Sequence, residues 1–185
     1  IERLRTHTDE AGALLREVLI GVTEFFRDPE AFEALKMLAI RPMLAAKQKD
    51  GTVRIWIAGC STGEEVYSIA ILIKEALSEL EDAPSIDIQI FATDIDVHAL
   101  KVARTGRYRE SAIKLSPERL KRWFIKDGSD YCAIPEIREL CVFSAHSLVK
   151  DPPFSRLDLI SCRNLLIYLD NDLQGRVIQT FHFAL

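Results

Sequence analysis

Residues 53–80 read VRIWIAGCSTGEEVYSIAILIKEALSEL, and the class of fold follows from their pattern. Its first part, Val53–Ala58, is mostly β-branched or aromatic, which is typical of a buried strand. Gly59–Gly63 follows as a loop of small residues. From about Glu64 to Leu80 the apolar residues recur at the spacing of a helix. A strand that leads through a small loop into a helix predicts the first unit of an open α/β fold.

A second unit of the same kind follows after a turn at residues 82–85. Ile86–Thr93 is rich in apolar and β-branched residues, and Asp94 comes directly after it. Asp96 is placed to cap a short helix, which Gly106 would end. The order strand, helix, strand, helix predicts a mostly parallel sheet with helices on both faces.

The residues before this core predict an N-terminal helical segment. Residues 1–20 have apolar side chains at helical spacing, and a connector follows them. Asp28 then precedes Pro29, which is the order of a capping residue and a first helical residue. We therefore expect a helical segment and connector over residues 1–28 and the main domain over residues 29–185.

The middle of this domain departs from the strand–helix alternation. Residues 131–134 and 140–143 are expected to pair as an antiparallel excursion, which would form a small β subdomain over about 127–146. Leu157–Ser161 is mostly apolar, which is typical of a buried parallel strand. Two more helices are predicted from their capping residues, Ser116 and Asp170.

The composition excludes several classes of protein. Of the 185 residues, 48% are hydrophobic and 28% charged, which excludes a disordered or collagen-like chain. No apolar run approaches the roughly 18 residues that a membrane span needs. A net charge of −4 makes nonspecific nucleic-acid binding a poor candidate. The cysteines form no CxxC pair and the histidines show no ligand spacing, so we expect no metal and a reduced, cytoplasmic setting.

Three predicted strands lead into small or polar residues, at the edge of the sheet where open α/β proteins bind ligands. After the first strand, Gly59 and its small neighbours would let a ligand approach the backbone closely. Glu64 and Glu65 come next, and these acids would repel phosphates, which argues against ATP or a dinucleotide. A plain structural turn is the alternative for this loop.

Asp94 follows the second strand, where a carboxylate can accept the hydrogen bonds of a ribose diol. The alternative is local capping, which Asp96 is better placed to perform. Arg163 and Asn164 follow the apolar run 157–161, and their alternative role is a salt bridge or a contact that fixes the loop. Together these strand ends predict a nucleoside ligand without a polyphosphate. S-adenosylmethionine fits best among common cofactors, because acids suit its positively charged sulfonium and amino groups.

Four motifs, taken in order and spacing, resemble those of the CheR-type chemotaxis methyltransferases over nearly the whole chain. They are VTEFFRD at 22–28, AGCSTGEEVYSIA at 58–70, ATDID at 92–96 and CRNLLIY at 162–168. The segment DPPFSRLD at 151–158 is similar to the version found in proteins that fuse CheB- and CheR-like domains.

The resemblance implies a Rossmann-like class I methyltransferase fold and an S-adenosylmethionine-dependent protein-glutamate O-methyltransferase of chemotaxis signalling. Its substrates would be glutamates on the cytoplasmic helices of methyl-accepting chemotaxis receptors, and a fusion protein would add a CheB-like methylesterase domain. After it gives up its methyl group, the cofactor would leave as S-adenosylhomocysteine. The family normally continues past residue 185 with further strands, so we expect the sheet of this chain to lack its last strands.

The resemblance also implies roles for individual residues. Arg163 and Tyr168 would lie nearest the transferred methyl group and are the candidate catalytic residues. The candidate cofactor-binding residues are Thr23, Arg27, Gly59, Glu64, Asp94, Ser147, Leu148, Arg163 and Asn164.

Two other functions compete with this prediction. A non-catalytic module could sense the cofactor or mediate interactions inside a fused signalling protein. It would bind the cofactor without transferring a methyl group to any receptor. A nicotinamide-dependent oxidoreductase shares the same sheet, but the spacing of Gly59 and Gly63 and the acids that follow argue against it.

Overall fold

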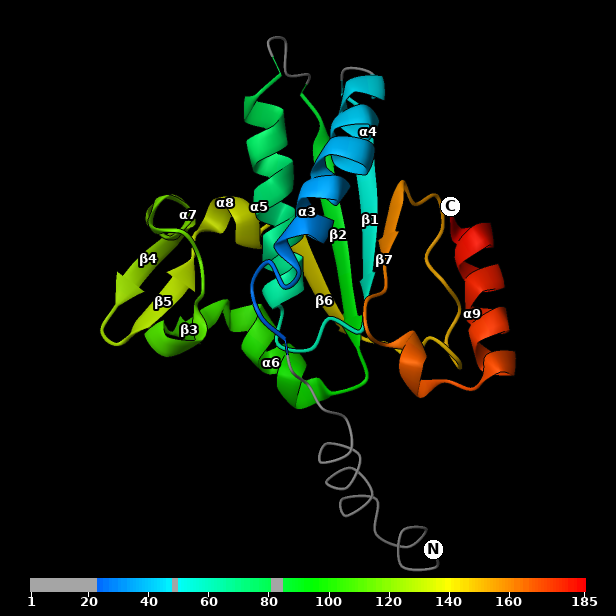
Figure 1. Cartoon of the computed structure of the whole chain (residues 1–185). Coiled ribbons are helices and arrows are strands. Elements are labelled where there is room, and N and C mark those ends of the chain that lie inside the picture. The colour runs from blue at the N-terminus through cyan, green and yellow to red at the C-terminus, as the bar shows by residue number, and fades with distance from the viewer. Residues whose placement is uncertain (1–22, 48–49, 81–84) are drawn as a thin grey trace, which may run out of the picture.

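A four-stranded parallel sheet forms the centre of the domain in the computed structural model, which describes residues 23–47, 50–80 and 85–185 (Figure 1). Its strands lie in the order β6 (Cys141–Ala145), β2 (Asp87–Asp94), β1 (Thr52–Ala58) and β7 (Leu159–Ser161). Each neighbouring pair is parallel. The strands therefore end at one common edge, where the sequence predicts the ligand.

Helices connect the strands and cover the sheet. They are α3 (Pro29–Leu35), α4 (Arg41–Ala46), α5 (Glu64–Ser78), α6 (Val97–Thr105), α7 (Pro117–Trp123), α8 (Pro135–Arg138) and α9 (Asn171–Ala184), with a π-helical turn at Lys36–Ile40 and 3₁₀ turns at Glu110–Ala112 and Leu166–Tyr168. The predicted caps of α6, α7 and α9 are confirmed, because Asp96, Ser116 and Asp170 each accept a backbone hydrogen bond there. None of the described helices is long and apolar enough to cross a membrane.

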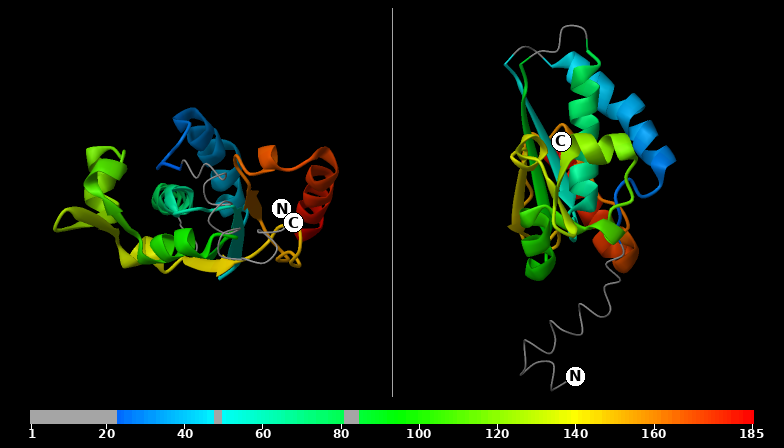
Figure 2. Two further views of the ribbon diagram at one scale, coloured as in Figure 1. Left: turned by 90° about the horizontal axis from the view of Figure 1, so that it is seen from below. Right: turned by 90° about the vertical axis from the view of Figure 1, so that its left-hand side faces the viewer.

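The two faces of β1 are buried by two different sets of side chains. Ile55 and Ile57 belong to the larger apolar cluster, which contains most of the buried residues of α5. Figure 2 shows α3, α4 and α5 together on this side of the sheet. Trp56 belongs to a second cluster, where its ring meets that of Phe181 in α9 edge to face at 5.4 Å. Helices thus flank both faces, as predicted, because a parallel sheet must bury both of them.

A second, antiparallel sheet is present, but it contains other strands than the sequence predicts. It joins β3 (Arg107–Arg109), β5 (Asp130–Ala133) and β4 (Phe124–Asp127) in that order. The predicted pairing of residues 131–134 with 140–143 is wrong, because β5 pairs with strands that precede it in the chain. β6 instead extends the main sheet, where parallel pairing satisfies backbone groups along the edge of β2.

The domain boundaries expected from the sequence remain a prediction. The helix expected over residues 1–20 lies outside the described residues. Within the expected subdomain at 127–146, β5 belongs to the small sheet and β6 to the main sheet. The small sheet and the main sheet therefore share this part of the chain.

Replacing Gly175 with alanine is expected to stabilise the domain by about 0.5–1 kcal/mol. Gly175 lies inside α9, and a Cβ built there meets no atom within 4 Å, so alanine gains helix propensity without a clash. Urea denaturation measures the change. Gly128 is the matched control, because it also has open space but its φ is 64°, where a Cβ is strained. Gly128→Ala should destabilise the domain, and a loss of stability in Gly175→Ala would contradict the prediction.

Candidate functional site

A cavity of about 520 Å³ lies at the edge where the parallel strands end, a size that suits a small-molecule ligand. Its walls come from the loops that follow β1, β2, β6 and β7, from the segment before α3, and from the first turns of α5 and α6. The lining residues are Thr23, Glu24, Arg27, Gly59, Cys60, Ser61, Glu65, Asp94, Ile95, Asp96, Ala99, His146, Ser147, Leu148, Val149, Arg163, Asn164, Leu165, Ile167, Tyr168 and Leu169.

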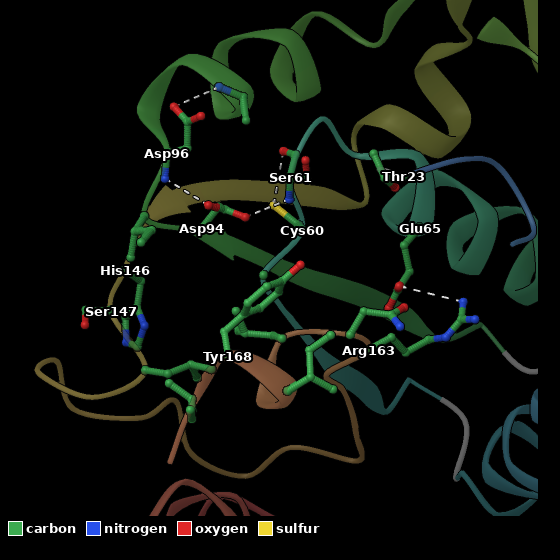
Figure 3. Close-up of a pocket in the computed structure, with 18 of the residues that line it drawn as sticks. Thr23, Cys60, Ser61, Glu65, Asp94, Asp96, His146, Ser147, Arg163 and Tyr168 are labelled. Carbon is green, nitrogen blue, oxygen red and sulfur yellow. Dashed lines mark hydrogen bonds and ion pairs between the residues drawn. The ribbon is translucent and has the colours of Figure 1, made fainter. Parts of the chain in front are cut away.

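The cavity has two chemically different ends. Figure 3 shows Asp94, Asp96 and Ser147 at one end, Glu65 and Arg163 at the other, and Tyr168 between them. The strand ends that the sequence places far apart in the chain thus meet around one space.

Asp94 joins the two loops that form the first end. Its Oδ2 atom accepts a hydrogen bond from the backbone N–H of Ser61 at 2.8 Å, and its Oδ1 atom accepts one from that of Asp96 at 2.8 Å. A carboxylate offers about four lone-pair positions, so Asp94 can accept two further hydrogen bonds from a ligand. Asp96 performs the local capping, as predicted. Asp94 therefore shapes the loops and also faces the cavity.

All the predicted cofactor-binding residues lie in the described part of the chain, and Glu64 is the one of them that does not line the cavity. Its carboxylate accepts a hydrogen bond from Thr62 Oγ1 at 2.7 Å and is also hydrogen-bonded to Thr23. Burial raises the pKa of this carboxyl group, and the hydrogen bonds partly oppose the rise. Glu64 thus connects the loop after β1 to the segment before α3.

Glu65, the next residue of α5, lines the cavity instead. Its Oε1 atom accepts a hydrogen bond from Ser161 Oγ at 2.6 Å, and its Oε2 atom lies 3.8 Å from Arg163 Nη1. Burial raises the pKa of this carboxyl group as well, against the lowering effect of Ser161 and Arg163. Neighbouring helical residues point about 100° apart, and in this structure Glu65 lines the cavity while Glu64 points to the adjoining loop.

Arg163 is held from the other side by the segment before α3. Its Nη2 atom donates to Asp28 Oδ2 at 2.6 Å and to the backbone carbonyl oxygen of Arg27 at 2.8 Å. Its guanidinium carbon also lies 4.9 Å from the ring centroid of Phe32. The ion pair considered as its alternative role is therefore present, and Arg163 lines the cavity as well.

Most residues assigned from the sequence converge on the cavity wall, and their individual roles remain predictions. Those that line it are Thr23, Arg27, Gly59, Asp94, Ser147, Leu148, Arg163, Asn164 and Tyr168.

Glu65, Asp96 and His146 also line the cavity, although no individual binding or catalytic role is predicted for any of them from the sequence. His146 comes directly after β6, and its Nε2 atom lies 3.0 Å from the carbonyl oxygen of Pro152. The prediction from the sequence places residues 140–143 in the small sheet. It therefore does not recognise that His146 follows a strand of the main sheet. The correct sheet order is the signal that would have identified it.

Acidic side chains outnumber basic ones on the cavity wall. The acidic residues are Glu24, Glu65, Asp94 and Asp96, and the basic ones are Arg27 and Arg163. Such a wall disfavours phosphate groups and favours a cationic ligand. Ile95, Leu148 and Val149 add apolar surface, which suits a flat aromatic ring.

Comparison with known proteins gives one family. The family model described as "CheR methyltransferase, SAM binding domain" matches residues 21–185. An uncharacterized 104.1 kDa protein of Rhodobacter capsulatus is 40% identical over 185 residues, which is 100% of this chain and 19% of that protein. The putative methyltransferase Cher3 of Pseudomonas putida is 38% identical over 181 residues, which cover 93% of this chain and 63% of Cher3.

A third relative is the chemotaxis protein methyltransferase of Salmonella typhimurium. It is 35% identical over 181 residues, which cover 91% of this chain and 57% of that protein. This chain therefore spans between about a fifth and two thirds of the length of these relatives.

Proposed function

Because the chain belongs to the CheR methyltransferase family, we propose that it transfers a methyl group from S-adenosylmethionine to glutamate side-chain carboxylates of chemoreceptors. This activity is that of a protein-glutamate O-methyltransferase, with S-adenosylhomocysteine as the second product. One observation carries the proposal. Residues from four motifs, far apart in the chain, line a single cavity at the ends of the parallel strands.

The first end of the cavity fits the nucleoside part of S-adenosylmethionine. Asp94 retains acceptor positions that suit the ribose diol. Ser147, Leu148 and Asn164 would lie against the adenine, next to the apolar side chain of Ile95.

The other end fits the charged part of the cofactor. Thr23, Arg27 and Gly59 would lie along the methionine group, with one glutamate of α5 as the partner of its amino group. The position of Glu65 on the wall favours it over Glu64 for this role. When bound, S-adenosylmethionine supplies an electrophilic methyl group, which an acceptor oxygen takes while the electron pair of the broken bond stays on sulfur.

The acceptor side requires little chemistry from the protein. A glutamate side chain has a pKa near 4.3, so it is ionised at neutral pH and needs no general base. Arg163 would hold the carboxylate by a charge-assisted hydrogen bond, and Tyr168 would lie beside it. The main contribution is alignment of the reacting atoms, which can account for roughly 7–11 kcal/mol of a barrier.

The same proposal includes the partners and the location. The acceptor glutamates would lie on cytoplasmic helices of methyl-accepting chemotaxis receptors, which places the domain in the cytoplasm. A CheB-like methylesterase domain in the same polypeptide is part of the proposal. It is supported by the resemblance at residues 151–158 and by the R. capsulatus relative, in which the matched region is 19% of the protein.

Methyl transfer to a receptor fragment tests the proposed function. We expect the full-length protein to transfer label from radiolabelled S-adenosylmethionine to the cytoplasmic fragment of a receptor from its own organism. The label should be released by mild base, because a carboxyl methyl ester is base-labile, and it should disappear when the acceptor glutamates are replaced by glutamine. Binding of S-adenosylhomocysteine without transfer to any receptor fragment would contradict the proposal and favour a non-catalytic module.

A further inference from the structure

Asp28 does not perform the capping role that its sequence position predicts. It stands at the N-cap of α3, directly before Pro29, yet its side chain accepts no capping hydrogen bond. Its backbone is in the left-handed region, with φ at 61°, which is unusual for a residue other than glycine. Strained backbone of this kind is concentrated at functional sites. What Asp28 does instead is bind Arg163.

This contact uses one arm of the Arg163 guanidinium completely. Nη2 carries two N–H bonds, and both have acceptors, Asp28 Oδ2 at 2.6 Å and the carbonyl oxygen of Arg27 at 2.8 Å. Nη1 lies 3.8 Å from Glu65 Oε2. The two groups form an ion pair, but this distance is too long for a hydrogen bond. Within the part of the chain that the structure describes, neither Nη1 nor Nε donates a hydrogen bond. Arg163 therefore keeps free donors on Nη1 and Nε only.

The free donors determine how Arg163 can grip a carboxylate. An unrestrained guanidinium binds a carboxylate with two parallel hydrogen bonds, and each of these forks needs Nη2 together with Nη1 or Nε. With Nη2 occupied, an incoming carboxylate can form a hydrogen bond to Nη1 or to Nε, but it cannot form either fork. One of its oxygens then remains without an Arg163 hydrogen bond. Each carboxylate oxygen keeps a second lone pair even in a fork, but an oxygen without an arginine hydrogen bond carries more of the negative charge and is the better nucleophile for a methyl group.

We propose that Asp28 is a positioning residue, which occupies Arg163 Nη2 so that the acceptor glutamate is held through one oxygen and attacks with the other. This inference rests on the proposed function. Asp28 does not line the cavity, and its side chain is 65% exposed, so it contacts Arg163 from outside the cavity. The ring of Phe32 further restricts the guanidinium on the side of α3.

Replacing Asp28 with glycine tests this directly, because glycine adopts a φ of 61° without strain and removes the carboxylate. The substitution frees one of the two Nη2 N–H groups and so opens one fork, while the Arg27 carbonyl oxygen keeps the other. In methyl transfer by the full-length protein to a receptor fragment, we expect kcat to fall about ten- to hundredfold. KM for the receptor should stay the same or fall, since a two-point grip binds the acceptor at least as well. Asp28→Asn keeps one uncharged acceptor, so its kcat should lie between those of the wild type and Asp28→Gly. Glu33→Gln, an exposed carboxylate of α3, is the matched control and should change neither constant.

A double-mutant cycle separates positioning from a general loss of structure. In an Arg163→Lys background, Asp28→Gly should have no further effect on kcat, because lysine has no fork to restrict. Affinity for S-adenosylhomocysteine should change less than about threefold in all Asp28 variants.

An unchanged kcat in Asp28→Gly, or a raised KM with unchanged kcat, would overturn the inference and leave the proposed function intact. A wild-type protein that methylates no receptor fragment would overturn the proposed function itself, and the inference with it.

Discussion

Replacing Asp94 with alanine is expected to weaken the binding of S-adenosylhomocysteine by at least about 100-fold, because each hydrogen bond to a charged group contributes roughly 1.5–3 kcal/mol. The substitution removes the acceptor proposed for the ribose diol. It also leaves the backbone N–H groups of Ser61 and Asp96 without their partner, and these bonds hold the two loops of the cavity. The lost ligand contact and the disturbed loops should therefore both lower the affinity for S-adenosylhomocysteine.

Calorimetric titration with S-adenosylhomocysteine measures this effect. Asp87→Ala is the matched control, because Asp87 is an exposed carboxylate at the opposite end of the same strand and should leave affinity unchanged. Asp94→Asn is informative as a second variant, since it keeps the shape of the side chain but turns one acceptor into a donor facing a backbone N–H. An affinity of Asp94→Ala within about threefold of the wild type would show that Asp94 does not contact the ligand.

The largest effect on stability is expected at Gly63, where alanine should destabilise the domain by about 3–5 kcal/mol, as the sum of backbone strain and overpacking. Gly63 has a φ of 95°, which L-residues rarely adopt. A Cβ there would lie 2.9 Å from Ala103 Cβ, 3.0 Å from Tyr108 Oη and 3.2 Å from Ala103 Cα. Because Cα of Ala103 belongs to the backbone of α6, the contact cannot be relieved by a rotamer change.

Urea denaturation and cofactor binding should both report this substitution. Gly63 ends the loop after β1 and precedes the first residue of α5, so displacing it also moves Glu64 and Glu65. Gly128→Ala serves as the reference for backbone strain alone, since its Cβ would meet no atom within 4 Å. If Gly63→Ala costs no more than Gly128→Ala, the close approach of α6 to this loop is not an important packing contact.

Several features could be predicted because they depend on residues close together in the chain. The strand, loop and helix over 53–80 follow from local propensity and periodicity, and the structure confirms them as β1 and α5 with bounds that differ by one or two residues. The cap at Asp96 was predictable for the same reason, since the bond spans two or three residues. The placement of Asp94 at the cavity followed from the rule that ligands bind at the ends of parallel strands.

Other features could not be predicted because they depend on which distant segments meet. The pattern of residues 140–143 is that of a strand, but nothing in it distinguishes a place beside β2 from a place beside β5. The choice between Glu64 and Glu65 depends on the rotation of α5 about its axis against the sheet. Asp28 has the sequence context of a helix cap, yet Arg163, which is 135 residues away, binds its carboxylate instead.

The α/β core, the loop between β1 and α5, the carboxylate after β2 and the family could all be inferred from the amino-acid sequence. These depend on local backbone preferences and on short motifs whose chemistry is read from their own residues. The partner strand of β6, the glutamate that faces the cavity and the contact that restrains Arg163 became known from the three-dimensional structure. The physical reason is that strand pairing, helix rotation and ion pairing across the chain are set by the packing of whole elements. That packing minimises unpaired backbone groups and exposed apolar surface over the entire domain.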